Sequence, residues 1–245
     1  MLDVTAAILA GGLGTRLRPT VADRPKVLAE ISGRPFLTFL FDQLLHAGIR
    51  RVVSCTGYLG EQVRAAFGDS YGSLHLLYSQ ETFLLGTAGA LRLALPLLES
   101  ESVLVMNGDS YCELDLQAFW TWHRGRQATA SLALAQLSDT RRYGRVEVDA
   151  EGTVLSFYEK GYTDEPGWVN AGIYLLQRSL LLKIPAKGAV SLERELFPVW
   201  IGHGLYGYRS KGRFLDIGTP EDYAEAQGFF ASQTVRAPVD RSIGS

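Results

Sequence analysis

Short apolar runs alternate with amphipathic stretches over roughly the first 110 residues. Four runs are mainly apolar, as expected for strands buried on both faces: residues 4–10, 51–55, 74–79 and 103–106. Three stretches between them carry apolar side chains at helical spacing: residues 35–47, 60–67 and 88–98. Strands and helices that alternate in this way predict βαβ units, and therefore an α/β fold with a doubly wound, mostly parallel sheet.

The pattern changes after Asp115. Further strands are predicted at 129–136, 144–149, 153–157, 168–176 and 206–208, and further helices at 115–124, 192–200 and 221–230. Turn residues between the second and third of these strands predict a hairpin, so we expect an inserted antiparallel subregion. Because no repeat or Pro/Gly/Ser-rich linker interrupts the chain, one domain is predicted over 1–231, with halves of about 1–112 and 113–231. The polar stretch 232–245 has no periodicity and is predicted to be a disordered tail.

The composition is that of an ordinary soluble globule. The 245 residues are 47% hydrophobic and 20% charged, with a formal net charge of −2. This charge gives no electrostatic argument for a nucleic-acid or membrane partner, and no apolar run could span a bilayer. The chain starts without a signal-peptide pattern, and Cys55 and Cys112 make no disulfide or metal framework. We expect a cytoplasmic protein with two buried, reduced thiols.

A glycine loop follows the first apolar run. Gly11, Gly12 and Gly14 allow backbone N–H groups to approach a ligand closely, and such a turn can form an anion site. Arg16 and Lys26 follow and would suit a polyphosphate. The spacing fits neither a P-loop nor a dinucleotide fingerprint. The loop therefore predicts a nucleoside triphosphate site, although such glycines can also serve only to reverse the chain.

Two aspartates follow apolar runs in distant parts of the sequence. If the sheet brings Asp109 and Asp216 to one edge, their carboxylates would suit Mg²⁺, which takes a few carboxylate oxygens together with phosphates and water. Structural interpretations remain for both residues. Asp109 could cap a short turn, and Asp216 could brace the turn at Gly218.

Six ordered motifs resemble those of the sugar-1-phosphate nucleotidylyltransferases, from about residue 5 to residue 230. They are residues 11–20 with Pro25-Lys26, then 85–91, 107–109, 159–160, 170–174 and 216–220. The resemblance implies a Rossmann-like fold and a Mg²⁺-dependent transfer of a nucleotide to a sugar 1-phosphate. Among these enzymes the chain is most similar to D-glycero-α-D-manno-heptose 1-phosphate guanylyltransferases.

The resemblance also implies a role for each motif. The base and ribose would lie against Leu9, Ala10, Gly11, Gly12, Gln80, Gly86, Thr87 and Gly89, and the triphosphate against Gly14, Thr15 and Arg16. Lys26 would bridge the two reacting phosphates, so Lys26 and Arg16 are the expected catalytic residues. Glu159, Asn170 and Gly172 would hold hydroxyls of the sugar, Lys160 would hold its phosphate, and Gly108 would belong to the same sugar-phosphate site. Asp109 and Asp216 would hold the Mg²⁺.

The implied reaction joins GTP and a heptose 1-phosphate into GDP-heptose and pyrophosphate, for heptose-containing surface glycans such as capsule, lipopolysaccharide or S-layer. Alternatives within the family are mannose 1-phosphate with GTP, or another sugar with UTP, CTP or dTTP. The chain departs from the commonest family pattern after Lys26 and at Gly161, both close to the expected sugar phosphate. A catalytically silent regulatory subunit is the alternative of another class, and a homodimer is possible for either.

Overall fold

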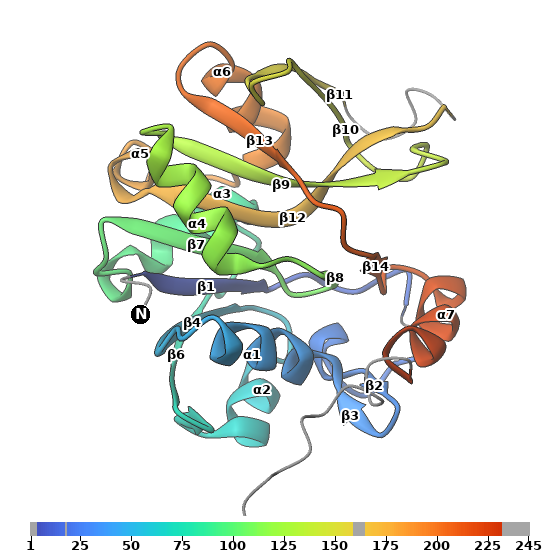
Figure 1. Cartoon of the computed structure of the whole chain (residues 1–245). Coiled ribbons are helices and arrows are strands. Elements are labelled where there is room, and N and C mark those ends of the chain that lie inside the picture. The colour runs from blue at the N-terminus through green and yellow to red at the C-terminus, as the bar shows by residue number, and fades with distance from the viewer. Residues whose placement is uncertain (1–3, 18, 159–164, 232–245) are drawn as a thin grey trace, which may run out of the picture.

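The computed structural model describes residues 4–17, 19–158 and 165–231. Four parallel strands form the centre of its main sheet, in the order β7 (Ser102–Asn107), β1 (Thr5–Ala10), β4 (Arg51–Thr56) and β6 (Leu74–Gln80). The short strand β5 (Ser70–Tyr71) pairs antiparallel with β6 at the edge of the sheet. These central strands match the four apolar runs, so the predicted mostly parallel central sheet is confirmed (Figure 1).

An antiparallel region extends the sheet beyond β7. The long strand β12 (Gly167–Gln177) pairs with β7, with β9 (Ala130–Leu137) and with β10 (Arg145–Val148). The hairpin partner of β10 is β11 (Val154–Tyr158), and β13 (Leu205–Arg209) lies parallel to β9. Within the described residues the sheet has ten strands. The predicted antiparallel subregion is therefore present, and its strands β9 to β13 follow the central parallel strands in the sequence.

Helices cover both faces of the sheet. On one face lie α1 (Phe36–His46), α2 (Gly60–Phe67), α4 (Leu116–Gly125) and α7 (Pro220–Ala231); on the other lie α3 (Gly86–Ala94), α5 (Arg178–Leu182) and α6 (Phe197–Trp200). Along β1, Ile8 packs into the first core and Ala7 into the second, because successive strand residues point to opposite faces. Two cores on one sheet confirm the doubly wound arrangement.

Short elements complete the framework around the strand ends. They are η1 (Lys26–Leu28), β2 (Glu30–Ile31), β3 (Arg34–Pro35), η2 (Leu95–Leu97), β8 (Ser110–Cys112) and β14 (Phe214–Asp216). The sequence pattern predicted none of them as separate elements. The helix expected at 192–200 is instead a π-helical turn, η3 (Leu192–Leu196), followed by α6.

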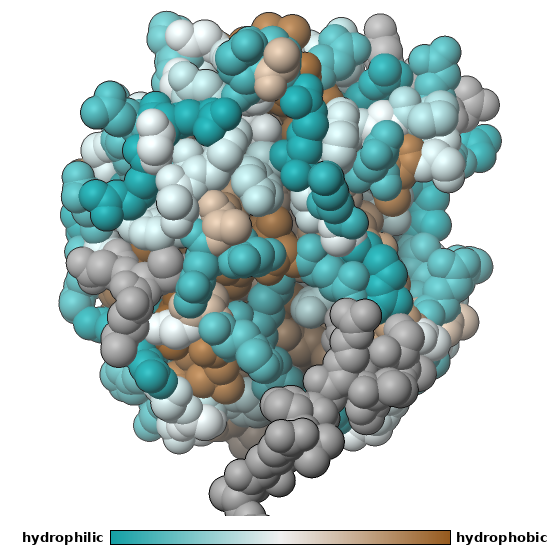
Figure 2. Space-filling view, viewed as in Figure 1, coloured by the Kyte–Doolittle hydropathy of each residue, from teal (hydrophilic) through white to brown (hydrophobic). Residues whose placement is uncertain are grey.

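Buried and surface residues follow the expected division. Cys55 and Cys112 are free and buried, as predicted, and burial raises the pKa of their thiols to about 12 and about 11. Hydrophilic residues cover most of the face in Figure 2, with hydrophobic ones between them. Among the described helices, none combines the length and apolar character needed to cross a membrane. The predicted tail, 232–245, lies outside the described residues, and the division at 112 stays a prediction.

Candidate active site

Two adjoining cavities lie where β1 and β7 end. The larger has a volume of about 580 Å³ and the smaller about 270 Å³, and both are lined by Asn107 and Arg194. Ligands of doubly wound sheets bind at the carboxyl ends of strands, so this position agrees with the fold. The predicted nucleotide-site residues that line the larger cavity are Leu9, Ala10, Gly11, Gly12, Gly14, Thr15, Arg16, Gly86 and Thr87.

The glycine loop lies close to the side chain of Glu81. A Cβ atom on Gly11 would lie 2.7 Å from Oε1 of Glu81, so a larger residue there would displace that carboxylate from its present position. Gly14 has a φ of +60°, a left-handed conformation that glycine adopts without strain. The loop then leads directly to Thr15 and Arg16, which line the same cavity. These glycines therefore shape a ligand-accessible wall as well as reversing the chain.

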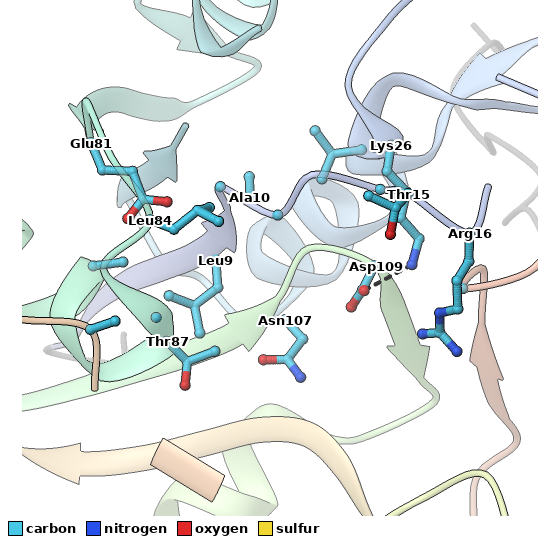
Figure 3. A pocket seen from close by; sticks show the side chains of 18 of the residues that line it. Leu9, Ala10, Thr15, Arg16, Lys26, Glu81, Leu84, Thr87, Asn107 and Asp109 are labelled. Carbon is cyan, nitrogen blue, oxygen red and sulfur yellow. Dashed lines mark hydrogen bonds and ion pairs between the residues drawn. The ribbon is translucent and has the colours of Figure 1, made fainter. Parts of the chain in front are cut away.

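A basic end of the larger cavity forms around Lys26. Its Nζ lies 2.8 Å from Oδ2 of Asp109, and its side chain is only 12% exposed. Figure 3 shows Lys26 and Asp109 facing each other, with the guanidinium of Arg16 beyond them. Arg16 also lies beside Gly218, where an added Cβ would be 3.2 Å from its Nη2. The two predicted catalytic cations and one predicted metal ligand are thus brought together.

The second predicted metal ligand lies on the neighbouring strand. Asp216 pairs with Ser110 in the β14–β8 register, and the backbone N–H of Ile217 donates to the carbonyl oxygen of Asp109 at 2.9 Å. Asp216 lines the smaller cavity, and its Oδ1 accepts a hydrogen bond from the N–H of Gly218. It therefore braces this turn, as the structural interpretation expects. Two carboxylates on adjacent strand ends that open on the cavities also fit Mg²⁺, which prefers oxygen ligands.

Glu81 marks the opposite end of the larger cavity. It follows β6, its Oε2 accepts a hydrogen bond from the N–H of Leu85 at 3.0 Å, and burial raises the pKa of its carboxyl group. In Figure 3 it lies with Leu84 far from the Lys26 end. Gln80, the predicted base ligand, is exposed and borders a separate hollow with Tyr78 and Arg64. Neighbouring positions along an extended chain point to opposite sides, which explains the difference.

The start of α3 forms the wall beside Glu81. Gly86 has a φ of +72°, and a Cβ there would lie 2.5 Å from the carbonyl oxygen of Val190. Thr87 donates from Oγ1 to Oε2 of Glu193 at 2.8 Å. Gly89, by contrast, is buried against the side chain of Leu85 and lines neither of the two cavities. The structure places it as a packing glycine behind the wall.

The smaller cavity is built at an irregularity in β12. The β12–β9 register shifts between Asn170 and Tyr174, and Gly172 there has a φ of +73°. Asn170 and Gly172 both line this cavity, as the sugar-site prediction requires. Gly108, by contrast, is buried and lines neither cavity, and an added Cβ there would lie 2.7 Å from the carbonyl oxygen of Leu9. Glu159 and Lys160 lie outside the described residues.

Sequence reasoning missed several polar residues that line the cavities. No ligand role was predicted for Asn107, Glu81, Glu193 or Arg194, although Asn107 belongs to the motif at 107–109. The charged character of Glu193-Arg194 was visible, but a helix predicted over 192–200 gives no reason to place it at a cavity. The fold brings it there because the turn packs against the start of α3.

Comparison with known proteins agrees with this geometry. The model of the nucleotidyl transferase family matches residues 5–233. The chain is 36% identical over 223 residues to D-glycero-alpha-D-manno-heptose 1-phosphate guanylyltransferase of Aneurinibacillus thermoaerophilus, with 91% of this chain and 96% of that protein covered. It is 37% identical over 225 residues to mannose-1-phosphate guanylyltransferase of Mycobacterium tuberculosis, with 90% of this chain covered. The chain spans only 63% of the length of that second protein.

A solved structure is also similar. Crystal structures of HddC from Yersinia pseudotuberculosis, alone and complexed with GMP-PN, superpose with TM-scores of 0.83 and 0.82 at 32% identity. In both cases the match covers 93% of this chain and 99% of that protein. The matched region includes both cavities, since the family model extends from β1 to α7. This chain therefore belongs to the nucleotidyl transferase family and is a nucleotidyltransferase.

Proposed function

We propose that this enzyme transfers GMP from GTP to a sugar 1-phosphate, with D-glycero-α-D-manno-heptose 1-phosphate as the acceptor, and releases pyrophosphate. The observation that carries the proposal is the pair of adjoining cavities that share Asn107 and Arg194. The larger is sized and charged for a nucleotide, and the smaller offers polar groups for a sugar. The heptose is favoured because the Aneurinibacillus protein named for it matches over 96% of its own length.

Glu81 supports guanine as the base. A carboxylate has two acceptor oxygens and, when ionised, no donor. Guanine presents two adjacent donors, N1–H and the N2 amino group, which such a carboxylate can accept together. Uracil and thymine present a single N–H between two carbonyl oxygens, which would face the carboxylate unfavourably. The position of Glu81 at the end opposite Lys26 leaves the length of the cavity for ribose and phosphates.

The proposed reaction is an in-line displacement at the α-phosphorus of GTP. A phosphate oxygen of the sugar 1-phosphate attacks, the bond to the β-phosphate breaks, and pyrophosphate leaves. Because a phosphate monoester is already largely dianionic near pH 7, the enzyme needs no general base. Lys26 and Arg16 align the phosphates and offset charge that builds up on their oxygens. Asp109 and Asp216 would hold Mg²⁺, which when bound neutralises phosphate charge.

A pyrophosphate-release assay over a grid of nucleotides and sugar 1-phosphates tests the proposal. We expect the fastest release with GTP and the heptose 1-phosphate, and its loss with EDTA or in Asp109→Asn. Asp69 is exposed and lines neither cavity, so Asp69→Asn serves as the control and should leave the rate of pyrophosphate release unchanged. A preference for mannose 1-phosphate would change the acceptor, and one for UTP, CTP or dTTP would overturn the role of Glu81. If no combination of nucleotide and sugar 1-phosphate releases pyrophosphate, the alternative of a catalytically silent, nucleotide-binding subunit is favoured.

Two further proposals concern the setting of the enzyme. Buried, reduced Cys55 and Cys112 are compatible with a cytoplasmic location, where both proposed substrates would be made. The apolar side chains exposed on α3 and the loop before it, Leu93, Phe83 and Leu84, could be covered in a homodimer. Cell fractionation and light scattering would test these two points separately from activity.

A further inference from the structure

Arg194 lies at the junction of the two cavities. It is exposed and lines both of them, as does Asn107. Among the described residues that line the smaller cavity, Arg194 is the only lysine or arginine, whereas Glu193 and Asp216 contribute carboxylates. The positive charge of Arg194 therefore favours an anionic group at this part of the smaller cavity, whereas Lys160, the other cation expected there, lies outside the described residues. The larger cavity has Arg16 and Lys26 as well, at the end near the glycine loop.

The turn that carries Arg194 is anchored on both sides of this residue. Ser191 caps it by accepting the N–H of Arg194 at 3.2 Å, and the N–H of Leu192 donates to Oγ1 of Thr87 at 2.8 Å. Glu193 then joins the turn to both cavities. Its Oε2 accepts from Thr87 at 2.8 Å and its Oε1 from the hydroxyl of Tyr174 at 3.2 Å. The backbone of Arg194 is thus fixed relative to the start of α3, which lines the larger cavity.

The same hydrogen bonds extend to the floor of the smaller cavity. The hydroxyl of the fully buried Tyr174 accepts from Nδ2 of Asn170 at 2.9 Å, and Oδ1 of Asn170 accepts the N–H of Gly172 at 2.9 Å. The turn is also π-helical, an irregularity that is often found at functional sites. Through these hydrogen bonds the backbone of Arg194 is held relative to Thr87 in the larger cavity and to Asn170 in the smaller one.

We propose that the guanidinium of Arg194 binds the phosphate of the sugar 1-phosphate and holds it at the junction, facing the α-phosphate of the nucleotide. This inference rests on the proposed function. A guanidinium suits the task because its fork of N–H donors can contact two phosphate oxygens at once. Because Arg194 lines both cavities, its charge at the junction can face both anionic substrates.

The test compares Arg194→Ala and Arg194→Lys with Arg124→Ala, an exposed arginine of α4 that lines neither cavity. For Arg194→Ala we expect the KM for the sugar 1-phosphate to rise about 10- to 100-fold, the scale of hydrogen bonds to a charged group. The KM for GTP should change less than about threefold, because base and triphosphate contacts remain. Arg194→Lys should recover part of the loss, and Arg124→Ala should behave as the wild type.

The outcomes separate this inference from the proposed function. If the wild-type enzyme makes no nucleotide sugar, the proposed function itself fails. If the wild type is active and Arg194→Ala keeps the acceptor KM, the role of Arg194 is overturned. A rise confined to the KM for GTP would also overturn it, because the arginine would then serve the nucleotide. Circular dichroism and the thermal midpoint of each variant establish that the fold is retained.

Discussion

Lys26 and Asp109 meet at 2.8 Å, although 83 positions separate them in the sequence. The lysine side chain is nearly buried and the carboxylate is 43% exposed, so the carboxylate is the partner that a cation from solution can reach. In the proposed reaction Asp109 would turn to the metal and Lys26 to the reacting phosphates. The ion pair would then keep the lysine in position until the substrates arrive.

Lys26→Ala should leave the fold intact and slow the reaction strongly. Loss of one preorganised electrostatic donor from a largely dry site costs about 3 kcal/mol of transition-state stabilisation, or roughly 10²–10³ in kcat. Steady-state kinetics of nucleotide-sugar formation measure it, with exposed Lys183→Ala as the matched control. Turnover of the Lys26 variant within a few-fold of the wild type would remove this residue from the catalytic machinery.

Glu81→Gln should weaken the binding of GTP more than the binding of other nucleotides. The amide presents one donor where the carboxylate has only acceptors, so we expect the KM for GTP to rise about 10- to 100-fold. Discrimination against UTP should fall by the same factor. Gln80→Ala, one residue away but outside both cavities, serves as the control. Equal effects of the two substitutions would contradict the assignment of the base end.

The same carboxylate predicts a pH dependence. Burial raises the pKa of Glu81 above its ordinary value of 4.5, so the carboxyl group protonates at a higher pH than an exposed glutamate. Protonation removes acceptor capacity, and GTP should bind more weakly as the pH falls through this raised pKa. Nucleotide binding measured by calorimetry between pH 7 and 4.5 should show the loss in the wild type. Glu81→Gln should lack this component.

At the scale of elements, the beginning of α3 depends on glycine. Gly86→Ala combines a φ of +72° with a Cβ only 2.5 Å from a backbone oxygen, and it should cost about 1–3 kcal/mol of unfolding free energy. Gly228→Ala, inside α7 with open space around its Cα, should instead stabilise the protein by about 0.5–1 kcal/mol. Chemical denaturation measures both, and a neutral Gly86→Ala would contradict the close packing against Val190.

Elements with clear periodicity could be predicted from the sequence. The helix expected at 60–67 matches α2 at both ends, and the one at 35–47 differs from α1 by a residue at each end. The helix expected at 88–98 instead begins at Gly86 and passes into a 3₁₀ turn after Ala94. Packing against Val190 fixes that start, and such a distant contact leaves no local pattern.

At the scale of the whole molecule, a buried histidine predicts acid sensitivity. His123 is 3% exposed beside Ser131, and burial lowers the pKa of its imidazole from 6.5 to about 4. Between these pH values the unfolded chain binds a proton that the folded chain does not. The contribution of neutral His123 to the free energy of unfolding is therefore complete above pH 6.5 and is lost as the pH falls toward 4.

The expected loss from His123 is about 2 kcal/mol of unfolding free energy between pH 7 and pH 5. Urea denaturation at several pH values measures it. His123→Asn should lower stability at pH 7 but flatten the slope in this range. His75→Asn, an exposed histidine of β6, should keep the wild-type slope. An unchanged slope in His123→Asn would show that other groups cause the acid sensitivity.

The part of the site close to the predicted strand ends could be predicted from the sequence. The glycine loop and Asp109 directly follow recognisable strands, Arg16 and Lys26 follow the loop in the sequence, and the structure brings all of them to one cavity. Glu81 was missed because the neighbouring Gln80 is the last residue of β6, and one position changes which side of the sheet a side chain faces. Arg194 was missed because its place depends on hydrogen bonds to residues about a hundred positions away.

The central claim is that the two cavities align both substrates for one direct displacement. It can be tested with GTP that carries a single sulfur of defined configuration on the α-phosphorus, together with the best acceptor from the grid. The configuration of that phosphorus in the nucleotide-sugar product is then determined by ³¹P NMR. The account predicts inversion, because the acceptor phosphate attacks opposite the leaving pyrophosphate. Retention would contradict it, because two successive displacements would require a covalent nucleotidyl-enzyme.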